Sequence, residues 1–320
     1  MNNKQYKDDS FLNRLSSFLY HYGGVRVKKI VQFKEKVFYI QTIENKAFIL
    51  KGKTSKHLLL QQAEFFNSIE AEFVNKFKLF PNGKRIIEGF GLYWTWIPYI
   101  EGKELDFSKH LDRKDAANTV KRFHIESKGI KIENPVIRQP LYIKFYNRME
   151  KLERTKAIME NYGFLNLFHD IKKFMKERLF LFGQLDWHSI EKKSVDHWQW
   201  VHGDVASHNF IRSKDNVHLI DFDLLSLSPS IYDYIQLGQR FLPFIDWKMD
   251  HLLTYLPLEK EEDLKTCLLG IAVPSDVIRE WWYFTMENHP GQENRKYLQL
   301  LSERWTLRKQ FVDDIEFMLR

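Results

Sequence analysis

Hydrophobic residues near the N-terminus follow the short, dense pattern of β-strands. Three runs rich in β-branched and aromatic residues are separated by polar turns, and two further runs follow a turn at residues 80–84. Such runs, bounded by turn residues, predict antiparallel strands. The expected strands lie at residues 25–31, 36–42 and 47–51, with two more within residues 86–100.

Helical spacing of apolar residues dominates the rest of the chain. One helix is expected at residues 11–22, and another at residues 55–76 with Ser55 as its N-cap. The chain is expected to be helical from Phe107 onward, with Asp115 as a candidate N-cap, and residues 141–190 predict two or three more helices. Proline and glycine then divide a helical C-terminal part into segments. These segments are residues 234–244, 247–255, 261–271, 275–287 and 292–319.

Polar residues gather where two apolar runs end, in the stretch WVHGDVASHNFIRSKDNVHLIDFD at residues 200–223. A turn at residues 214–216 can fold Asp221 back beside Asn209. One carboxylate and one amide oxygen would then converge, which suits Mg²⁺ sharing its shell with phosphate oxygens and water. Asp204 is left to accept a proton from a hydroxyl group. This division of roles is that of phosphoryl transfer.

The same stretch resembles a known family. H-G-D-x-x-x-x-N followed by I-D-F-D is similar to the aminoglycoside phosphotransferase and choline kinase branch of the protein-kinase-like fold. The segment from Ser228 to Asp233 resembles that family's G-D-P-x-x-D, although Ser228 replaces the acidic residue. The resemblance implies that Asp233 braces the catalytic loop. His202 is expected to hold the loop by a hydrogen bond to the backbone. Asp223 is expected to support the metal from behind Asp221.

In the N-terminal part, the resemblance implies a nucleotide site. Lys51 would hold the α- and β-phosphates of ATP, and a glutamate of the following helix would pair with it. Glu64 is our choice for that glutamate, with Glu70 and Glu72 as alternatives. Residues 94–102 resemble the family's hinge, where backbone groups at Ile97 and Tyr99 would bind adenine.

Two departures argue against an ordinary nucleotide site. Residues 32–36 contain no glycine, so backbone N–H groups cannot easily close over phosphates. Pro98 removes a hydrogen-bond donor from the hinge.

A second resemblance involves residues 122–129, which are similar to a segment of the CotS/YutH-type spore-coat-associated proteins of endospore-forming bacteria.

Composition limits the classes of partner and compartment. The 320 residues are 44% hydrophobic and carry a formal net charge of +7, but basic and acidic residues are interspersed, which predicts no nucleic-acid partner. The single cysteine, Cys267, excludes an intramolecular disulfide, and it is expected to be buried. Residues 1–10 lack the apolar core of a signal peptide, and no apolar run has membrane-spanning length. A cytoplasmic protein is expected.

Together these patterns predict an α+β, bilobal protein-kinase-like fold. The expected domains are a small sheet lobe at residues 1–96, a hinge at 97–102 and a mostly helical lobe at 103–320. Two functions remain open, and the first is our preferred interpretation. One is a spore-coat-associated protein in the mother cell or the coat, with coat proteins as partners and Mg²⁺–ATP binding retained or lost. The other is an active kinase that transfers phosphate from ATP to the hydroxyl group of a small-molecule acceptor.

Overall fold

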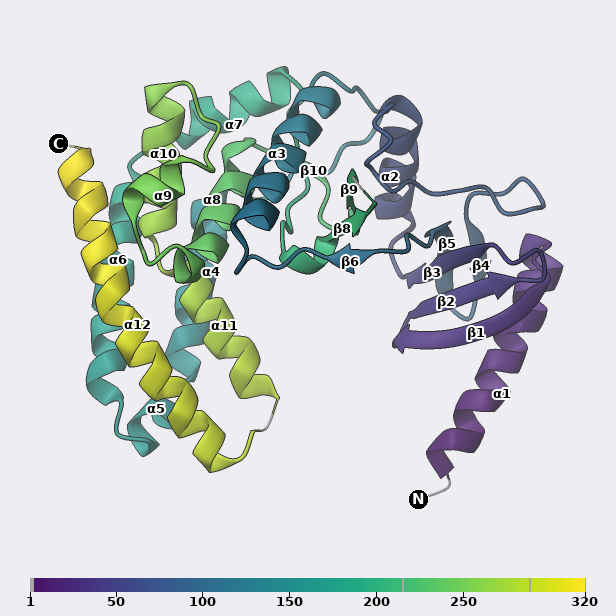
Figure 1. Cartoon of the computed structure of the whole chain (residues 1–320), viewed down its shortest axis with the longest axis horizontal. Helices are drawn as coiled ribbons and strands as arrows, with labels where there is room; N and C mark the ends of the chain where they lie inside the picture. The colour runs from purple at the N-terminus through teal and green to yellow at the C-terminus, as the bar shows by residue number, and fades with distance from the viewer. Residues whose placement is uncertain (1–2, 215, 288, 320) are drawn as a thin grey trace. The chain divides into compact units, whose positions relative to one another are not determined.

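The computed structural model describes residues 3–214, 216–287 and 289–319, with side chains from residue 10 on (Figure 1). It divides into two compact units. The first comprises Met1–Glu104, Ile130–Val136 and Phe210–Asp223, and the second comprises Leu105–Gly129, Ile137–Asn209 and Leu224–Arg320. The sequence-based boundary at residues 97–102 stays a prediction. The turn expected at residues 214–216 includes Asp215, which lies outside the described residues.

The first unit is built on a five-stranded antiparallel sheet with strand order β1-β2-β3-β5-β4. Its core is aromatic: the ring of Trp96 stacks on Phe48 with 3.9 Å between centroids, and Trp94 and Phe38 are fully buried. A second sheet, β6-β8-β9, belongs to the same unit. The bounds are α1 (Asn3–Phe18), β1 (Val27–Lys34), β2 (Val37–Thr42), β3 (Ala47–Lys53), α2 (Lys56–Ser68), β4 (Ile87–Gly89), β5 (Leu92–Pro98), β6 (Lys103–Glu104), β8 (Phe210–Ser213) and β9 (Asn216–Leu219).

Helix α2 begins as expected but ends earlier. The Ser55 hydroxyl accepts a hydrogen bond from the backbone N–H of Leu58 at 3.4 Å, so the N-cap is confirmed. The helix stops at Ser68, whereas the apolar spacing predicted that it would continue to residue 76. The reason is a competing contact: Val74 forms a parallel bridge with Leu219 of β9. The apolar residues after Ser68 are therefore buried as part of an extended segment and not on a helix.

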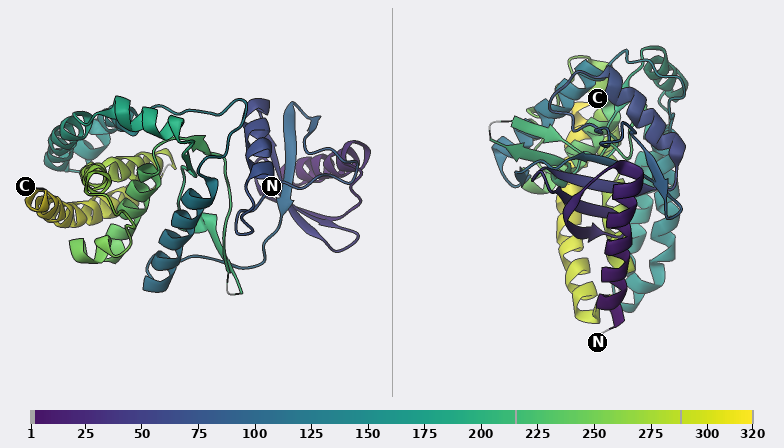
Figure 2. Two further views of the ribbon diagram at one scale, coloured as in Figure 1. Left: turned by 90° about the horizontal axis from the view of Figure 1, so that it is seen from above. Right: turned by 90° about the vertical axis from the view of Figure 1, so that its right-hand side faces the viewer.

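The second unit is mostly helical, and its buried helix α8 packs against α3 and α10 (Figures 1 and 2). Helices α11 and α12 run antiparallel beside each other. A short two-stranded sheet, β7 with β10, flanks the polar loop of the sequence motif. The bounds are α3 (His110–Ser127), α4 (Leu141–Arg154), α5 (Lys156–Asn161), α6 (Leu165–Gly183), α7 (Trp187–Asp196), β7 (Trp200–Val201), β10 (Ser226–Leu227), α8 (Ile231–Phe241), α9 (Met249–Leu253), α10 (Glu261–Ala272), α11 (Ser275–Met286) and α12 (Gly291–Met318).

Two sequence-based expectations for this unit were wrong in detail. Asp115 does not cap α3, which already starts at His110. A turn fixes that start, because the Asp106 carboxylate accepts a hydrogen bond from the backbone N–H of Ser108 at 3.0 Å. Residues 141–190 form four helical segments rather than two or three, since the chain breaks at Thr155, after residue 161 and again before Asp186, whose carboxylate caps α7.

The α+β class, with a small antiparallel sheet and a larger helical part, is confirmed. Cys267 is fully buried in α10, as expected. Within the described ranges, no helix combines the length and apolarity needed to cross a membrane.

Candidate active site

The loop after β7 is held by a buried carboxylate on α8. Asp233 is fully buried, and its Oδ1 accepts a hydrogen bond from the backbone N–H of Gly203 at 2.9 Å. Its Oδ2 accepts from the backbone N–H of His202 at 2.8 Å and from the Nε2 of His124 at 3.0 Å. Burial alone would raise the pKa of Asp233, but these donors and the charge of His124 lower it. An ionised Asp233 therefore fixes the backbone of the loop.

Gly203 supplies a turn that other residues would strain. Its φ is +82°, in the left-handed region that favours glycine. A Cβ at this position would lie 2.7 Å from the carbonyl oxygen of Leu224. The loop can therefore pass this close to its neighbour only because residue 203 has no side chain. The Nδ1 of His202 accepts a hydrogen bond from the backbone N–H of Asp204 at 3.3 Å and completes the turn.

Asp204 and Asn209 lie at the two ends of this loop and contact each other. The Asn209 Nδ2 donates to the backbone oxygen of Asp204 at 2.8 Å and to its Oδ2 at 3.1 Å. The carbonyl oxygen of the Asn209 side chain makes no hydrogen bond with any described residue, so it is available to a cation. Asp204 remains partly exposed, with 38% of its side-chain surface accessible.

Arg240 is a site residue that sequence reasoning missed. Its Nη2 lies 2.8 Å from Oδ1 of Asp204. Arg240 is two helical turns after Asp233 on α8, so both side chains reach the same loop. The signal was present, because Arg240 is the single charged residue after Asp233 in an otherwise largely buried helix.

In the first unit, Lys51 and Asp221 form an ion pair. The Lys51 Nζ lies 2.7 Å from Oδ1 of Asp221. Burial alone would raise the pKa of Asp221, but the charge and hydrogen bond of Lys51, with contributions from a hydrogen bond of Asp223 and the charge of Lys53, lower it to about 2. Asp221 also has a φ of +63°, an uncommon left-handed backbone for a residue other than glycine. Such strain is typical of functional positions.

A second pair lies beside the first, between Lys53 and Asp223. Lys51 and Lys53 are two residues apart on β3, so their side chains point to the same face of the sheet. This spacing could have predicted that Lys53 lies at the site beside Lys51. The two pairs border a small cavity of about 20 Å³ in the first unit. Asp223 therefore lies next to Asp221, with its own cationic partner.

Helix α2 faces this cavity with Gln62 instead of a glutamate. The Gln62 Nε2 donates to the backbone oxygen of Phe222 at 2.7 Å, and Gln62 is buried. Glu64, our choice as the partner of Lys51, accepts a hydrogen bond from the backbone N–H of Glu133 at 3.2 Å. Residues 62 and 64 differ by about 200° around a helix, so only one of them can face the sheet. The structure thus corrects the expected Lys51–Glu64 pair to Lys51–Asp221.

The expected adenine hinge is occupied by hydrogen bonds within the first unit. The backbone N–H of Tyr99 donates to the oxygen of Ala47 at 3.0 Å. The Pro98 oxygen accepts from the Asn75 side chain at 3.0 Å. Ile97 pairs with Ile49 in the sheet and lines the small cavity. The backbone donor expected at Tyr99 is therefore already used, and an adenine contact at Ile97 stays a prediction.

Asp221 of the first unit and Asn209 of the second each carry an oxygen atom of the kind that hard cations prefer. Asp221 is ionised at neutral pH, and Asn209 offers a carbonyl oxygen. Among the residues that the structure describes, no three His, Cys, Asp or Glu side chains come together to hold a metal. A cation bound to Asp221 in the first unit would complete its shell with phosphate oxygens and water, as Mg²⁺ commonly does.

Comparison with known proteins gives a family match over most of the chain. The profile described as the phosphotransferase enzyme family matches residues 36–249. No curated protein sequence matches the chain.

Solved structures share the fold at low sequence identity. An aminoglycoside phosphotransferase from Alicyclobacillus acidocaldarius subsp. acidocaldarius DSM 446 matches with a TM-score of 0.72 and 15% identity, covering 91% of this chain and 92% of its own. Amicoumacin kinase hAmiN, in complex with AMP-PNP, Ca²⁺ and Ami, matches with a TM-score of 0.63 and 16% identity. The match covers 98% of this chain and 96% of the kinase chain. Choline kinase from Cryptosporidium parvum Iowa II matches with a TM-score of 0.55 and 12% identity. The match covers 91% of this chain and 90% of the choline kinase chain.

Proposed function

The chain belongs to the phosphotransferase enzyme family, and from this premise we propose that it transfers the γ-phosphoryl group of ATP to the hydroxyl group of a small molecule. The observation that carries the proposal is the catalytic loop. Buried Asp233 fixes the backbone at His202 and Gly203, and the loop presents a partly exposed Asp204 carboxylate. A loop held in this way, around a carboxylate, suits a reaction that depends on positioning.

In the proposed reaction, the acceptor oxygen forms a bond to the γ-phosphorus. The bond from that phosphorus to the oxygen bridging the β- and γ-phosphates breaks, and ADP leaves. The acceptor's proton passes to the Asp204 carboxylate. Arg240 holds Oδ1 of Asp204, and Asn209 donates to Oδ2. These two contacts orient the carboxylate, and a basic oxygen lone pair remains available for the proton.

We assign nucleotide binding to the lysines of β3. Lys51 and Lys53 are paired with Asp221 and Asp223 and border a common cavity. Phosphate oxygens would attract the same two ammonium groups. Mg²⁺, with Asp221 and Asn209 as protein ligands, would supply charge neutralisation at the transferred phosphate. Amicoumacin kinase hAmiN in complex with AMP-PNP and Ca²⁺ supports this assignment by analogy.

A role in the spore coat is the second candidate, in which the protein serves mainly in assembly with coat proteins. It is favoured by the hinge, where the Tyr99 N–H and the Pro98 oxygen are already hydrogen-bonded within the unit. The strand connection without glycine at residues 32–36 favours it too. Under this candidate, the protein stays in the mother cell or enters the coat, and Asp204 has no acceptor.

An acceptor screen decides between the two candidates. The full chain is incubated with Mg²⁺ and radiolabelled ATP together with a panel of small hydroxyl compounds, beside the Asp204→Asn variant. The proposal expects label in at least one compound with the wild type and none with Asp204→Asn, while both proteins bind Mg²⁺–ATP. Equal transfer by Asp204→Asn would show that Asp204 is not the base. Nucleotide binding without any transfer would favour the assembly role.

A further inference from the structure

A group of basic side chains lies in the part of the second unit that holds Asp204, and two of them, Lys144 and Arg240, act directly on the Asp204 charge. Their charges act on one another and on Asp204: Lys144 is influenced by Arg148, Arg138, Arg279 and Asp204, and Arg240 by Arg279 and Asp204. We call these five residues the basic cluster. Its members are Arg138, Lys144, Arg148, Arg240 and Arg279.

The fold brings the cluster together from separate elements. Lys144 and Arg148 lie one turn apart on α4, and their side chains project from the same face of the helix. The Arg148 Nη1 donates to the backbone oxygen of Ser275, the first residue of α11, at 3.3 Å. Arg279 follows one turn later on α11. Arg240 of α8 connects the cluster to Asp204.

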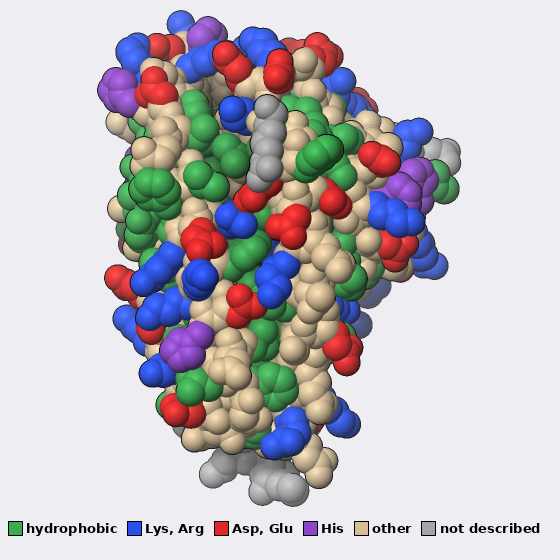
Figure 3. All heavy atoms as spheres, turned by 90° about the vertical axis from the view of Figure 1, so that its left-hand side faces the viewer, with side chains coloured by type: hydrophobic (Ala, Val, Ile, Leu, Met, Phe, Trp, Pro, Cys, Tyr) green, Lys and Arg blue, Asp and Glu red, His purple; other side chains and the backbone are tan. Residues whose placement is uncertain are grey.

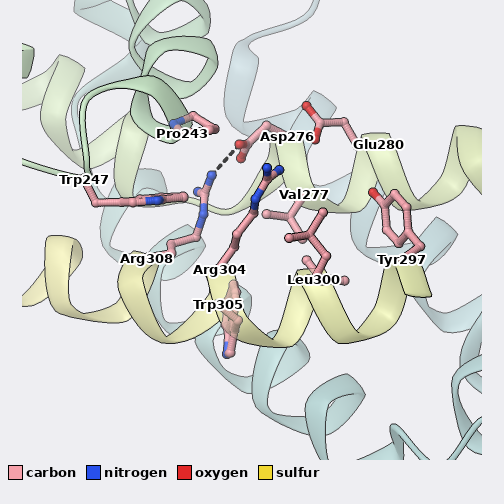
Figure 4. Close-up of a pocket in the computed structure, with 11 residues that line it drawn as sticks. Pro243, Trp247, Asp276, Val277, Glu280, Tyr297, Leu300, Arg304, Trp305 and Arg308 are labelled. Atoms are coloured by element: carbon pink, nitrogen blue, oxygen red, sulfur yellow. Dashed lines mark hydrogen bonds and ion pairs between the residues drawn. The ribbon is translucent and has the colours of Figure 1, made fainter. Parts of the chain in front are cut away.

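The carboxylates near the cluster each have a cationic partner. Asp204 pairs with Arg240 at 2.8 Å, and the Glu280 Oε1 lies 3.6 Å from Nη2 of Arg279. Asp276 turns toward Arg308 of α12, in a cavity of about 100 Å³ (Figure 4). Burial and the neighbouring Asp276 raise the pKa of Glu280.

Lys144 is the member of the cluster best placed to meet a ligand. Its side chain reaches solvent, and its ammonium group makes no hydrogen bond or ion pair with any residue that the structure describes. Desolvation and the charges of Arg148, Arg138 and Arg279 lower its pKa to about 8. Desolvation and the charge of Arg279 lower the pKa of Arg148 and of Arg240 to about 10. Bringing these cations together costs folding energy, and a bound anion would offset that cost.

The chain's net positive charge alone does not explain such a cluster. On the face shown in Figure 3, Lys and Arg side chains lie among Asp and Glu side chains without forming a large patch of one sign. Beside Asp204, in contrast, basic residues outnumber the carboxylates they meet. The concentration of positive charge is thus specific to the surroundings of the proposed base.

From this arrangement we infer that the acceptor is an anionic alcohol. Its phosphate or carboxylate group binds Lys144, Arg148 and Arg279, and its hydroxyl group meets Asp204. The inference rests on the proposed function, because it names the substrate class of that same site. Guanidinium groups hold phosphate and carboxylate oxygens through paired hydrogen bonds, and an ammonium group adds a point charge.

Calorimetric titration of the full chain at low ionic strength tests the inference with three alcohols. Glycerol 3-phosphate and glycerate carry the two kinds of anion, and choline carries a cation. The anionic alcohols are expected to bind, and choline is not. The tighter of the two anionic probes identifies phosphate or carboxylate as the preferred group. Failure of both to bind, or binding of choline with equal affinity, would overturn the inference.

Two variants of α4 make the test specific to the cluster. Lys144→Ala removes an exposed, unpaired cation and is expected to weaken binding of the anionic alcohols about tenfold. Arg154→Ala removes a cation from the last turn of the same helix and matches the change in net charge. Its affinity should change less than about twofold, since it alters only the distant field. Equal losses in the two variants would contradict a built anion site.

Nucleotide binding, measured separately by the effect of Mg²⁺–ATP on thermal unfolding, distinguishes this inference from the proposed function. If the wild type binds Mg²⁺–ATP but no anionic alcohol, the inferred class of acceptor is wrong, and the proposed phosphoryl transfer is not contradicted. Binding of anionic alcohols that depends on Lys144, without nucleotide binding, would support the anion site and contradict phosphoryl transfer.

Discussion

The Nζ of Lys51 lies 2.7 Å from Oδ1 of Asp221, in the first of the two compact units. The pair joins β3 to the residues that follow β9, which are 170 positions apart. Because the pKa of Asp221 is lowered from 3.8 to about 2 in the folded chain, its ionisation stabilises the fold above pH 3.8. That contribution is lost as the pH falls through about 2.

Removal of the lysine should reverse the shift. In Lys51→Met, burial of Asp221 is no longer offset by the nearest charge, so its pKa should rise from about 2 toward or above 3.8. Carboxyl carbon chemical shifts followed against pH report the titration. Lys28→Met, which removes a lysine from the exposed Lys28–Asn45 contact on β1, is the control. A midpoint that stays near 2 in Lys51→Met would show that Lys51 does not cause the shift.

Loss of the buried carboxylate of α8 should destabilise the whole fold. Asp233→Ala leaves the backbone N–H groups of His202 and Gly203 and the His124 ring without their acceptor. We expect a loss of about 3–5 kcal/mol in the free energy of unfolding, as for other broken buried charge pairs. Chemical denaturation measures it. Asp196→Ala, at an exposed pair with Lys192, should cost less than about 1 kcal/mol. Similar losses in both variants would contradict the bracing role.

A methyl group at Gly203 should disturb the catalytic loop by two separate effects. The left-handed backbone costs about 1–2 kcal/mol for an alanine, and the new Cβ would lie 2.7 Å from the Leu224 oxygen. Gly129→Ala isolates the first effect, because Gly129 has a φ of +84° and open space around it. Denaturation of both variants should therefore show Gly203→Ala as the less stable. Equal stability would mean that the loop moves away from Leu224 at no cost.

Binding of an anionic alcohol should weaken as the pH rises through about 8. Lys144 loses its proton there, whereas glycerate stays ionised. The other charged groups that act on Lys144 are Arg148, Arg138, Arg279 and Asp204. Glycerate affinity measured across this range in the wild type should fall, and in Lys144→Ala it should stay level. A pH profile unchanged by the substitution would assign the titration to another group.

Much of this account could be predicted from the sequence. The strands near the N-terminus have strong local signals, and the order H-G-D, Asn209 and I-D-F-D predicted the loop that holds Asp204. These features are local because each depends on residues within a few positions. Lys53 was missed although it is predictable from strand alternation with Lys51.

The parts that could not be predicted depend on contacts between distant residues. Whether Gln62 or Glu64 faces the sheet depends on the rotation of α2, which the carbonyl of Phe222 helps to fix. The end of α2 depends on the bridge to Leu219, more than a hundred residues away. Likewise, the basic cluster joins α4, α8 and α11, whose charges look dispersed along the chain.

Thermal unfolding with and without Mg²⁺–ATP, on the wild type, Asp221→Ala and the control Asp196→Ala, tests the central claim most directly. A ligand that binds only the folded state stabilises it by about 2.7 kcal/mol at a hundredfold excess over its Kd. We predict a raised midpoint for the wild type and for Asp196→Ala, and none for Asp221→Ala. An unchanged midpoint in the wild type at millimolar nucleotide would contradict nucleotide binding, and an undiminished rise in Asp221→Ala would contradict the assigned site.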